Sequence, residues 1–336
     1  MILYDPQSRP ALSEYGISIP IAPSATRRTI ENLRADPRTA DRVDQALTSR
    51  GATTVTRADL ERVHSRDYVS RLFSPHVTRE IERTYELIDG QGNYNRYDPS
   101  SARRPLSELF DYALGTVSGS YECCRYAVER SSCFYLGGGM HHARYDTGAG
   151  FCPVNDVVIA ARKIQHDHGI HKLWIIDLDV HKGDGTAALT AEDATVRTLS
   201  IHMARGWPLD GDPHLPDGSL HPSHIPSDVD IPIEEGGEEE YLTRLSDGLR
   251  ALDRFERPEL AIVLYGADPY EKDELPSAAG IKLSLSQMAA RDELVYSFLH
   301  KRGIKQAYLK AGGYGIHAAE PLTQFLRWYL TDAPRR

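Results

Sequence analysis

Acidic and imidazole side chains follow one short apolar run in the middle of the chain. The run is Leu173–Ile176, and the segment continues as DLDVHKGDG to Gly185. A short apolar run closed by a glycine-containing turn is typical of a buried strand in an α/β sheet. Because side chains alternate along a strand, Asp177, Asp179 and His181 would share one face at its end. Buried carboxylates this close repel each other unless a cation lies between them, and zinc is often bound by aspartate and histidine. The segment therefore predicts a divalent metal site. A loop of aspartates that cap a helix N-terminus is the alternative.

Three other predicted strands also end in small residues and reactive side chains. Ser132–Leu136 leads into GGGMHHA, Leu260–Tyr265 into GAD, and Gln306–Leu309 into KAGGYG. Glycine turns allow the main chain to approach a site closely. Each ending taken alone could be an ordinary turn. Since ligands of parallel sheets bind beyond the carboxyl ends of the strands, the four endings together predict one shared site.

The elements that position these residues alternate regularly from Leu106 onward. A further strand is expected over Thr195–Ile201. Apolar periodicity predicts helices over Leu106–Glu129, Val154–His168, Glu239–Phe255, Ser286–Lys301 and His317–Leu330. Strands that alternate with helices indicate an α/β fold, in which a mostly parallel sheet carries helices on both faces.

The first hundred residues are less regular. Short helices are expected over Thr26–Arg34 and Asp41–Leu47, and a longer helix over Ala58–Phe73. The polar stretch Ser74–Pro105 is long for a connection inside a domain, which predicts a loop at the rim of a binding site. There is no clear domain boundary and no internal repeat, so residues 1–336 are expected to form a single domain.

Composition limits the function classes. No apolar run approaches the ~20 residues of a membrane span, and the N-terminal segment lacks the pattern of a signal peptide. The 4 cysteines show no CxxC spacing, which favours a reducing compartment and predicts a cytoplasmic protein. With 39 Lys+Arg against 48 Asp+Glu the net charge is -9, which disfavours nucleic-acid partners, and no membrane partner is expected without a spanning run. The charge is compatible with a cationic substrate.

The motifs carry a family resemblance as an ordered set. GGGMHHA, GAGFCPVND, DLDVHKGDG, GAD and GGYG follow one another along the chain. This set resembles the zinc-dependent histone deacetylases and their bacterial relatives, among them the acetylpolyamine amidohydrolases. The resemblance covers nearly the whole chain from about Tyr112 onward, and the N-terminal hundred residues match less clearly. It implies the arginase/deacetylase fold, a single α/β domain around a central eight-stranded parallel sheet flanked by helices.

The resemblance implies one catalytic zinc ion bound by Asp179, His181 and Asp268. Three protein ligands leave an open position for water and the substrate carbonyl. It also implies a monovalent cation, K⁺ or Na⁺, near the same strand. The oxygens for this cation would come from Asp177, Asp179, His181, Ser200 and Ile201.

The catalytic residues are also carried over from the resemblance. His141 and His142 match tandem histidines above the metal, paired with Asp177 and Asp184 respectively. A carboxylate on the far imidazole nitrogen fixes the tautomer and raises basicity. We expect His142 to be the general base and then the general acid, and His141 to act mainly by electrostatics. Tyr314 matches the tyrosine that stabilises the oxyanion.

Five residues are expected to contact the substrate. Gly150 and Phe151 match one wall of an acyl-lysine channel, Trp207 is expected to supply the other, and Leu275 would line it. Asp98 resembles a rim aspartate that holds the substrate backbone, although the surrounding loop aligns poorly.

Two departures from the family pattern bear on function. Lys182 stands where relatives often carry histidine or glutamine, and its side chain is expected to point away from the metal face. The segment Ser200–Asp230 is closer to bacterial and class IV members than to class I, which leaves the substrate open.

The predicted function is zinc-dependent hydrolysis that removes an acetyl or longer acyl group from the side-chain amine of lysine in proteins. An acetylpolyamine or another small acylated amine is the alternative substrate. A binuclear arginase-like ureohydrolase is less favoured, because Pro269 and Tyr270 follow Asp268 where an Asp-x-Asp pair would be needed. A non-catalytic binding module is disfavoured by the presence of every motif residue. The sequence makes no prediction of the oligomeric state.

Overall fold

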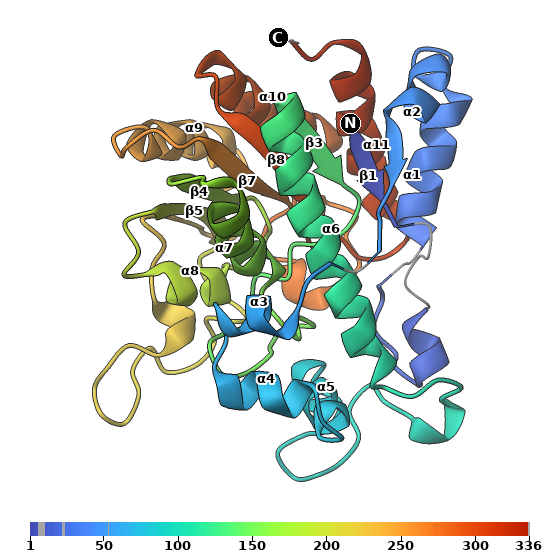
Figure 1. The fold of residues 1–336 in the computed structure, drawn as a ribbon, viewed down its shortest axis with the longest axis vertical. Coiled ribbons are helices and arrows are strands. Elements are labelled where there is room, and N and C mark those ends of the chain that lie inside the picture. Colours follow the sequence, from blue (N-terminus) through green and yellow to red (C-terminus); the bar gives the residue numbers. More distant parts are fainter. Residues whose placement is uncertain (6–10, 22–23, 53, 335–336) are drawn as a thin grey trace.

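One eight-stranded, all-parallel sheet forms the centre of the molecule in the computed structural model, which describes residues 1–5, 11–21, 24–52 and 54–334. Its strand order is β2-β1-β3-β8-β7-β4-β5-β6, so β7 and β4 are neighbours in the interior of the sheet (Figure 1). The strands are β1 (Ile2–Tyr4), β2 (Leu47–Ser49), β3 (Ser132–Tyr135), β4 (Leu173–Asp177), β5 (Val196–Met203), β6 (Val229–Ile233), β7 (Leu260–Tyr265) and β8 (Lys305–Lys310).

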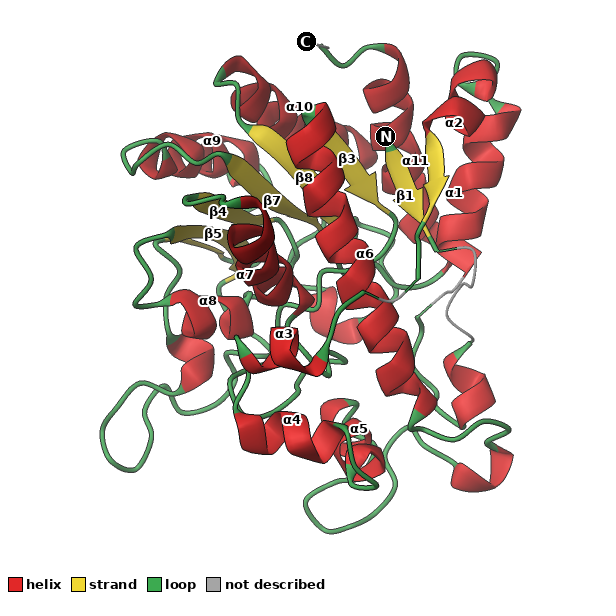
Figure 2. Cartoon of the chain, viewed as in Figure 1, coloured by secondary structure: helices red, strands yellow, loops and turns green. Residues whose placement is uncertain are grey.

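Helices cover both faces of the sheet (Figure 2). Trp174 and Ile176 of β4 share a core cluster with α1, α9, α10 and α11, whereas Leu173 and Ile175 pack with α6 and α7 on the opposite face. This alternation follows from the two-residue period of a strand, and it explains why a strand buried on both faces is apolar throughout. The α-helices are α1 (Ser24–Ala35), α2 (Ala40–Ala46), α3 (Arg57–Glu61), α4 (Arg66–Leu72), α5 (Val77–Thr84), α6 (Glu108–Arg130), α7 (Asp156–His168), α8 (Asp184–Thr190), α9 (Tyr241–Leu252), α10 (Leu285–Lys301) and α11 (Ala319–Thr331).

The predicted fold class, a parallel eight-stranded α/β sheet flanked by helices, is confirmed. The five predicted strands and the five predicted helices of the regular region all occur, with ends within two or three residues. The central strands are fully buried, and burying each large apolar side chain contributes roughly 1.5–3 kcal/mol. The assignment of residues 1–336 to a single domain stays a prediction.

Two expectations for the N-terminal region are wrong. The single helix predicted over Ala58–Phe73 is two helices, α3 and α4, because Ser65 accepts a hydrogen bond from the Tyr68 N–H and so begins a new helix. The stretch Ser74–Pro105 is not loop throughout, since it contains α5 and a short 3-10 helix, η2 (Pro99–Ser101). Ile81 of α5 is fully buried, so tertiary packing orders a segment whose composition is polar.

Three strands escaped prediction. β1 and β2 have 3 residues each, too few to show a period. β6 contains Pro232, which usually argues against a strand. Because β6 is the edge strand beside β5, the missing N–H of proline is tolerated there.

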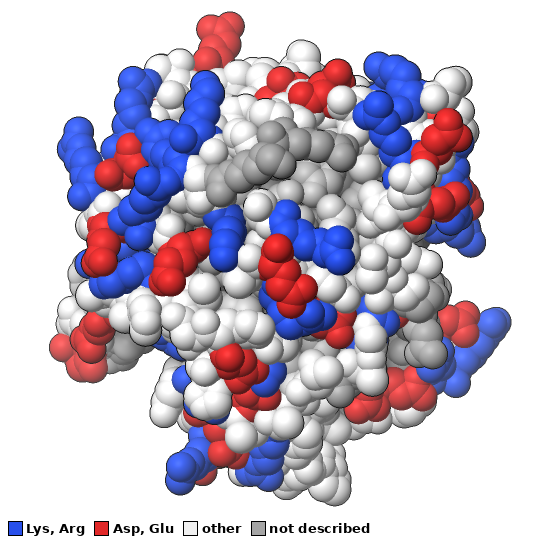
Figure 3. All heavy atoms as spheres, turned by 45° about the horizontal axis from the view of Figure 1, so that its top comes forward, with Lys and Arg blue, Asp and Glu red and all other residues white. Residues whose placement is uncertain are grey.

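The charged surface is mixed in sign. Lys and Arg side chains lie interspersed with Asp and Glu over the face shown in Figure 3. No helix of the described residues is long and apolar enough to cross a membrane. A cytoplasmic location stays a prediction.

Candidate metal centre and catalytic cavity

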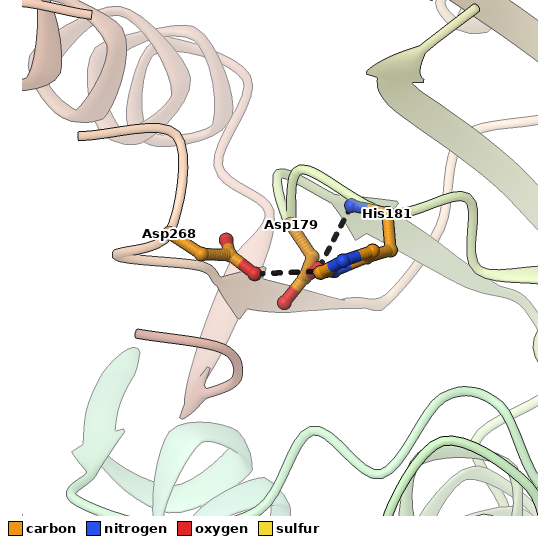
Figure 4. Close-up of side chains that lie close together, drawn as sticks. All are labelled: Asp179, His181 and Asp268. Carbon is orange, nitrogen blue, oxygen red and sulfur yellow. Dashed lines mark hydrogen bonds and ion pairs between the residues drawn. The ribbon is translucent and has the colours of Figure 1, made fainter. Parts of the chain in front are cut away.

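A compact group of potential metal ligands lies just beyond the ends of strands β4 and β7. Asp179 and His181 follow β4, and Asp268 follows β7 (Figure 4). Their ligand atoms lie within 4.8 Å of one another, and all three residues are buried. His181 Nδ1 lies 3.1 Å from Asp179 Oδ1 and 3.4 Å from Asp268 Oδ2. The structure therefore brings together the ligand set that the resemblance implied.

Main-chain N–H groups hold the two carboxylates in place. The Val180 N–H donates to Asp268 Oδ1 over 3.1 Å, and the Gly312 N–H donates to Asp179 Oδ2 over 2.8 Å. A Cβ atom at Gly312 would lie 2.0 Å from Asp268 Oδ2. Glycine is therefore required at position 312, since it alone lets the loop that carries Tyr314 approach the metal ligands so closely.

These residues fit a zinc ion. Asp268 Oδ2 is buried and has no hydrogen-bond partner among the described residues. Burial and the negative charge of Asp179 raise the pKa of Asp268 to about 8. A bound cation would remove both the unpaired oxygen and the repulsion between the carboxylates. Two carboxylates and one imidazole are a donor set that suits catalytic zinc.

Two histidine–aspartate pairs lie next to this group. His141 Nδ1 is 2.6 Å from Asp177 Oδ2, and His142 Nδ1 is 2.7 Å from Asp184 Oδ1. The two imidazole centroids are 3.9 Å apart. In each ring the carboxylate contacts Nδ1, so Nε2 is the nitrogen left for chemistry. These are the pairings expected from the sequence.

The two histidines differ in their electrostatics. Burial lowers the pKa of His141, but the charges of Asp177 and Asp179 outweigh it and raise that pKa to about 9. Burial and the adjacent charge of His141 lower the pKa of His142 to about 4. The Asp184 charge is shared, because Arg144 donates two hydrogen bonds to its other oxygen, at 2.9 and 2.7 Å. A neutral His142 beside a protonated His141 suits the first as proton acceptor.

Asn155 and Asp156 hold the loop that carries the tandem histidines. The Asn155 side-chain amide donates to the carbonyls of His141 and Ala143, at 3.2 and 3.3 Å. Asp156 accepts hydrogen bonds from the N–H groups at the start of this loop. Sequence reasoning missed both roles. The available signal was the Asn-Asp pair at the end of GAGFCPVND, where Asn155 also caps α7.

Tyr314 lies on the loop that follows β8, and two carboxylates accept hydrogen bonds from the main chain of this loop. Its N–H donates to Asp273 over 2.7 Å, and the Ile316 N–H donates to Glu274 over 3.0 Å. Burial and the charges of Asp179 and Asp268 raise the pKa of Tyr314, so its hydroxyl keeps its proton and can act as a donor. Sequence reasoning did not identify the roles of Asp273 and Glu274.

Aromatic rings pack against Tyr314 and His142. Phe151 lies 6.4 Å from Tyr314 in an edge-on arrangement, and Trp207 lies 4.5 Å from His142, centroid to centroid. At Gly150 the φ angle is +53° and a Cβ atom would lie 2.3 Å from Trp207. Glycine at this position therefore permits both the turn and the contact. A cavity of about 180 Å³ borders Gly150, Phe151 and Tyr314. Its lining includes Gly139, Met140, Gly150, Phe151, Cys152 and Tyr314.

Comparison with known proteins identifies the family. The family model for the histone deacetylase domain matches residues 19–327. The chain belongs to the histone deacetylase family. An uncharacterized protein of the cyanobacterium Picosynechococcus sp. is 31% identical over 77% of this chain and 76% of its own length. A probable deacetylase of Methanothermobacter thermautotrophicus is 27% identical over 78% of this chain and 80% of its own length. Histone deacetylase 2 of Arabidopsis thaliana is 29% identical over 59% of this chain and 48% of its own length.

Membership of the histone deacetylase family supports deacetylase activity and accounts for the fold. The family resemblance and the fold inferred from the motifs are thereby confirmed. The motif residues of the metal group, the tandem histidines and Tyr314 all lie inside the matched range.

Lys182 differs from the usual histone deacetylase pattern without entering the ligand group. Its ammonium lies 2.5 Å from Asp230 Oδ1, and His202 Nε2 lies 3.3 Å from the other Asp230 oxygen. Its side chain thus points toward β5 and β6. The expectation that Lys182 points away from the metal face is confirmed.

Three of the residues expected to bind a monovalent cation lie together at the end of β4 and in the middle of β5. Asp177 pairs with Ser200 in the sheet register, and Ile201 follows. Ser200 Oγ is buried without a hydrogen-bond partner among the described residues. An unpaired buried hydroxyl of this kind fits a cation ligand.

Asp98 and Leu275, both predicted to contact the substrate, make local contacts in the structure. The Asp98 carboxylate accepts hydrogen bonds from the Ser100 N–H and hydroxyl, at 2.9 and 2.6 Å, and caps η2. Leu275 is buried two residues after Asp273. Their roles as rim and channel residues stay predictions.

A second metal position beside Asp268 is not supported by the neighbouring residues. Tyr270 is 2% exposed, and its hydroxyl donates to Glu320 over 2.5 Å. The structure places only Asp179, His181 and Asp268 in a ligand group within its described residues. This favours one catalytic ion over the two that an arginase-like ureohydrolase uses.

Proposed function

We propose that this chain is a zinc-dependent amidohydrolase that removes an acetyl or longer acyl group from the side-chain amine of lysine in proteins. One observation carries the proposal: a buried ligand group lies beside a carboxylate-paired neutral histidine and beside the loop that carries a tyrosine. The ligand group is Asp179, His181 and Asp268, the histidine is His142, and the tyrosine is Tyr314. Family membership and deacetylase relatives support the same reaction class.

The residues of the chain divide the chemistry between them. A zinc ion bound by the ligand group would act as a Lewis acid on the acyl carbonyl and the attacking water. His142 would accept the proton of that water at Nε2 and then donate it to the nitrogen of the leaving amine. Asp184 holds the opposite nitrogen of this ring over 2.7 Å, which fixes its tautomer.

The remaining groups stabilise charge and geometry. Tyr314 would donate a hydrogen bond to the oxyanion, a contribution of about 3 kcal/mol for a well-placed donor. His141, with its pKa raised to about 9, would contribute positive charge and orientation rather than proton transfer. K⁺ or Na⁺ would be bound by Asp177, Asp179, His181, Ser200 and Ile201, and would offset part of the negative charge of the aspartates.

The substrate side chain would enter between Phe151 and Trp207. Gly150 lets the Trp207 ring pack against the loop that carries Phe151, Leu275 would extend the wall, and Asp98 would hold the main chain at the rim. A narrow aromatic passage selects an extended acyl-lysine side chain, because its methylene groups bury apolar surface on the rings.

An acetylated polyamine is the second candidate substrate, and one observation favours it. A cavity of about 510 Å³ beside Trp207 is lined by Asp210, Glu234 and Glu235, with Arg205 as its basic side chain. Excess acidic charge there would attract the further ammonium groups of a polyamine. It would equally favour basic residues next to the acyl-lysine of a peptide.

Two other functions are disfavoured. An arginase-like ureohydrolase would need further ligands for a second metal. A non-catalytic binding module would not need the buried His142–Asp184 pair or a tyrosine on the loop whose Gly312 N–H holds Asp179.

A panel of substrates tests the proposal. Values of kcat/KM would be measured for an acetyl-lysine peptide, longer acyl-lysine peptides, acetylated polyamines and arginine. We expect turnover of acyl-lysine peptides to exceed that of the acetylated polyamines. A preference for acetylated polyamines would move the function to the small-molecule alternative, and urea release from arginine would contradict deacetylation altogether.

A further inference from the structure

Arg291 is a buried cation that the proposed reaction does not use. It lies in α10, has no exposed surface, and is one of the largest fully buried side chains. Its Nη1 donates to two main-chain carbonyls, Gly266 O over 2.8 Å and Leu178 O over 3.2 Å. Leu178 precedes the ligand Asp179, and Gly266 stands two residues before the ligand Asp268.

These carbonyls lie where the sheet stops providing partners. The β4–β7 register ends with Asp177 opposite Leu264, and one more bond joins the Leu178 N–H to the Leu264 carbonyl. Beyond that point the segments that follow β4 and β7 are no longer paired in the sheet, and they form the loops that carry the metal ligands. The guanidinium of Arg291 thus bridges the two ligand segments at the first place where the main chain no longer joins them.

The two segments are in direct contact at this bridge. A Cβ atom at Gly266 would lie 2.5 Å from Asp179 Cα and 2.7 Å from Asp268 Oδ1. A small shift of one segment against the other would therefore change the separation of the ligand oxygens. The guanidinium limits that shift, because one nitrogen donates to both segments and the planar group is fixed elsewhere.

Asp292 and Tyr265 fix the guanidinium. Arg291 Nε donates to Asp292 Oδ1 over 2.8 Å, and Nη2 lies 2.8 Å from the same oxygen. The guanidinium also stacks 5.0 Å from the centroid of the Tyr265 ring. Buried ion pairs often contribute little net stability compared with apolar side chains of similar size. A role in holding geometry accounts for this pair better than a role in stability alone.

We propose that Arg291 is a positioning residue that sets the spacing of the metal ligands by holding the Leu178 and Gly266 carbonyls together. This inference rests on the proposed zinc site and extends it to a residue outside the ligand group. Supporting groups around a metal site typically change metal affinity by about 10–100-fold when removed. The same range is expected here.

The test measures zinc affinity in two variants of the full chain. Arg291→Lys keeps a positive charge but cannot bond both carbonyls and Asp292 in the same plane. The double variant Arg291→Met/Asp292→Leu removes the pair without leaving an uncompensated buried charge. Val295→Ala is the matched control. Val295 is buried one turn further along α10, and its truncation creates a cavity while removing no hydrogen bond, since its side chain has no polar atom.

Zinc dissociation constants would be measured on the metal-free proteins by competition with a chelator, together with the melting temperature of each. Both Arg291 variants are expected to bind zinc about 10–100-fold more weakly, whereas Val295→Ala lowers the melting temperature and leaves the dissociation constant unchanged. Folded Arg291 variants that bind zinc as tightly as wild type would overturn the inference about Arg291 but leave the proposed function standing. A wild-type chain that binds no zinc would overturn the proposed function as well.

Discussion

The two sides of the candidate site are built differently. The ligand side, Asp179, His181 and Asp268, follows the central strands β4 and β7 within a few residues and is held by main-chain N–H groups. The other side consists of His142 and Tyr314, the proposed proton acceptor and oxyanion donor, and stands on glycine-rich loops that side chains from other elements hold. A rigid strand end suits groups that must keep a fixed spacing around an ion. A loop supported by side chains suits groups that contact a substrate. Changes on the first side should therefore release the metal, and changes on the second should slow the reaction with metal still bound.

The largest effect is expected on the ligand side. Asp179→Ala or Asp268→Ala should abolish activity and sharply reduce bound zinc, because three ligands cannot be reduced to two without loss of affinity. The fold should survive, since the ligands lie at strand ends and outside the apolar core. Metal analysis and circular dichroism would check this. Full zinc occupancy in both variants would refute the ligand assignment.

Tyr314→Phe should give the next largest effect, on the opposite side. The substitution keeps the ring and removes only the hydroxyl, whose hydrogen bond strengthens as the carbonyl oxygen gains charge. We expect kcat to fall by ~10²–10³-fold with zinc content and melting temperature unchanged. If the variant turned over an acetyl-lysine peptide within a few-fold of wild type, Tyr314 would be a structural residue.

Substitution of the two tandem histidines should affect kcat to different extents. His142→Ala should lower kcat by ~10²-fold or more, since it removes the proton acceptor, while His141→Ala should lower it less. The lowered pKa of His142 and the raised pKa of His141 are the physical basis of this ranking. Single-turnover rates of the zinc-loaded variants would measure it. A wild-type rate for zinc-loaded His142→Ala would exclude this residue as the base.

The smallest effect is expected at the rim. Asp98→Ala should raise KM more than it lowers kcat, because a residue that only holds the substrate contributes equally before and during the reaction. Steady-state kinetics with two acyl-lysine peptides would measure the change. An unchanged KM with both peptides would remove the Asp98 loop from the site.

The central strands and the N-terminal helices α1 and α2 could be predicted from sequence, whereas the other N-terminal elements could not. Leu260–Tyr265 is an apolar run that ends in glycine, and its predicted bounds are those of β7. β1 and β2 are too short for a pattern, and Pro232 obscures β6. Ser65 divides a helical pattern into α3 and α4, and only the buried contacts of Ile81 reveal the helix inside Ser74–Pro105. Local pattern therefore predicted the buried strands and most of the helices packed on them, and failed where tertiary contacts decide.

The site was predictable only where side chains act directly. Asp179 and His181 are marked by their spacing after a strand, and the family motifs supply Asp268 and Tyr314. Asn155, Arg144, Asp273 and Arg291 act through hydrogen bonds to the main chain or to another side chain far along the sequence. No spacing rule marks such a residue, because its partner is defined by the fold.

Zinc titration of the metal-free protein tests the central claim most directly. Metal would be removed with a chelator, zinc added back in known amounts, and turnover of an acetyl-lysine peptide measured at each step. We predict no turnover without metal, a linear rise as zinc is added, and a plateau at one ion per chain. Full turnover by the metal-free protein, or a plateau reached only at two ions per chain, would contradict a single catalytic metal held by Asp179, His181 and Asp268.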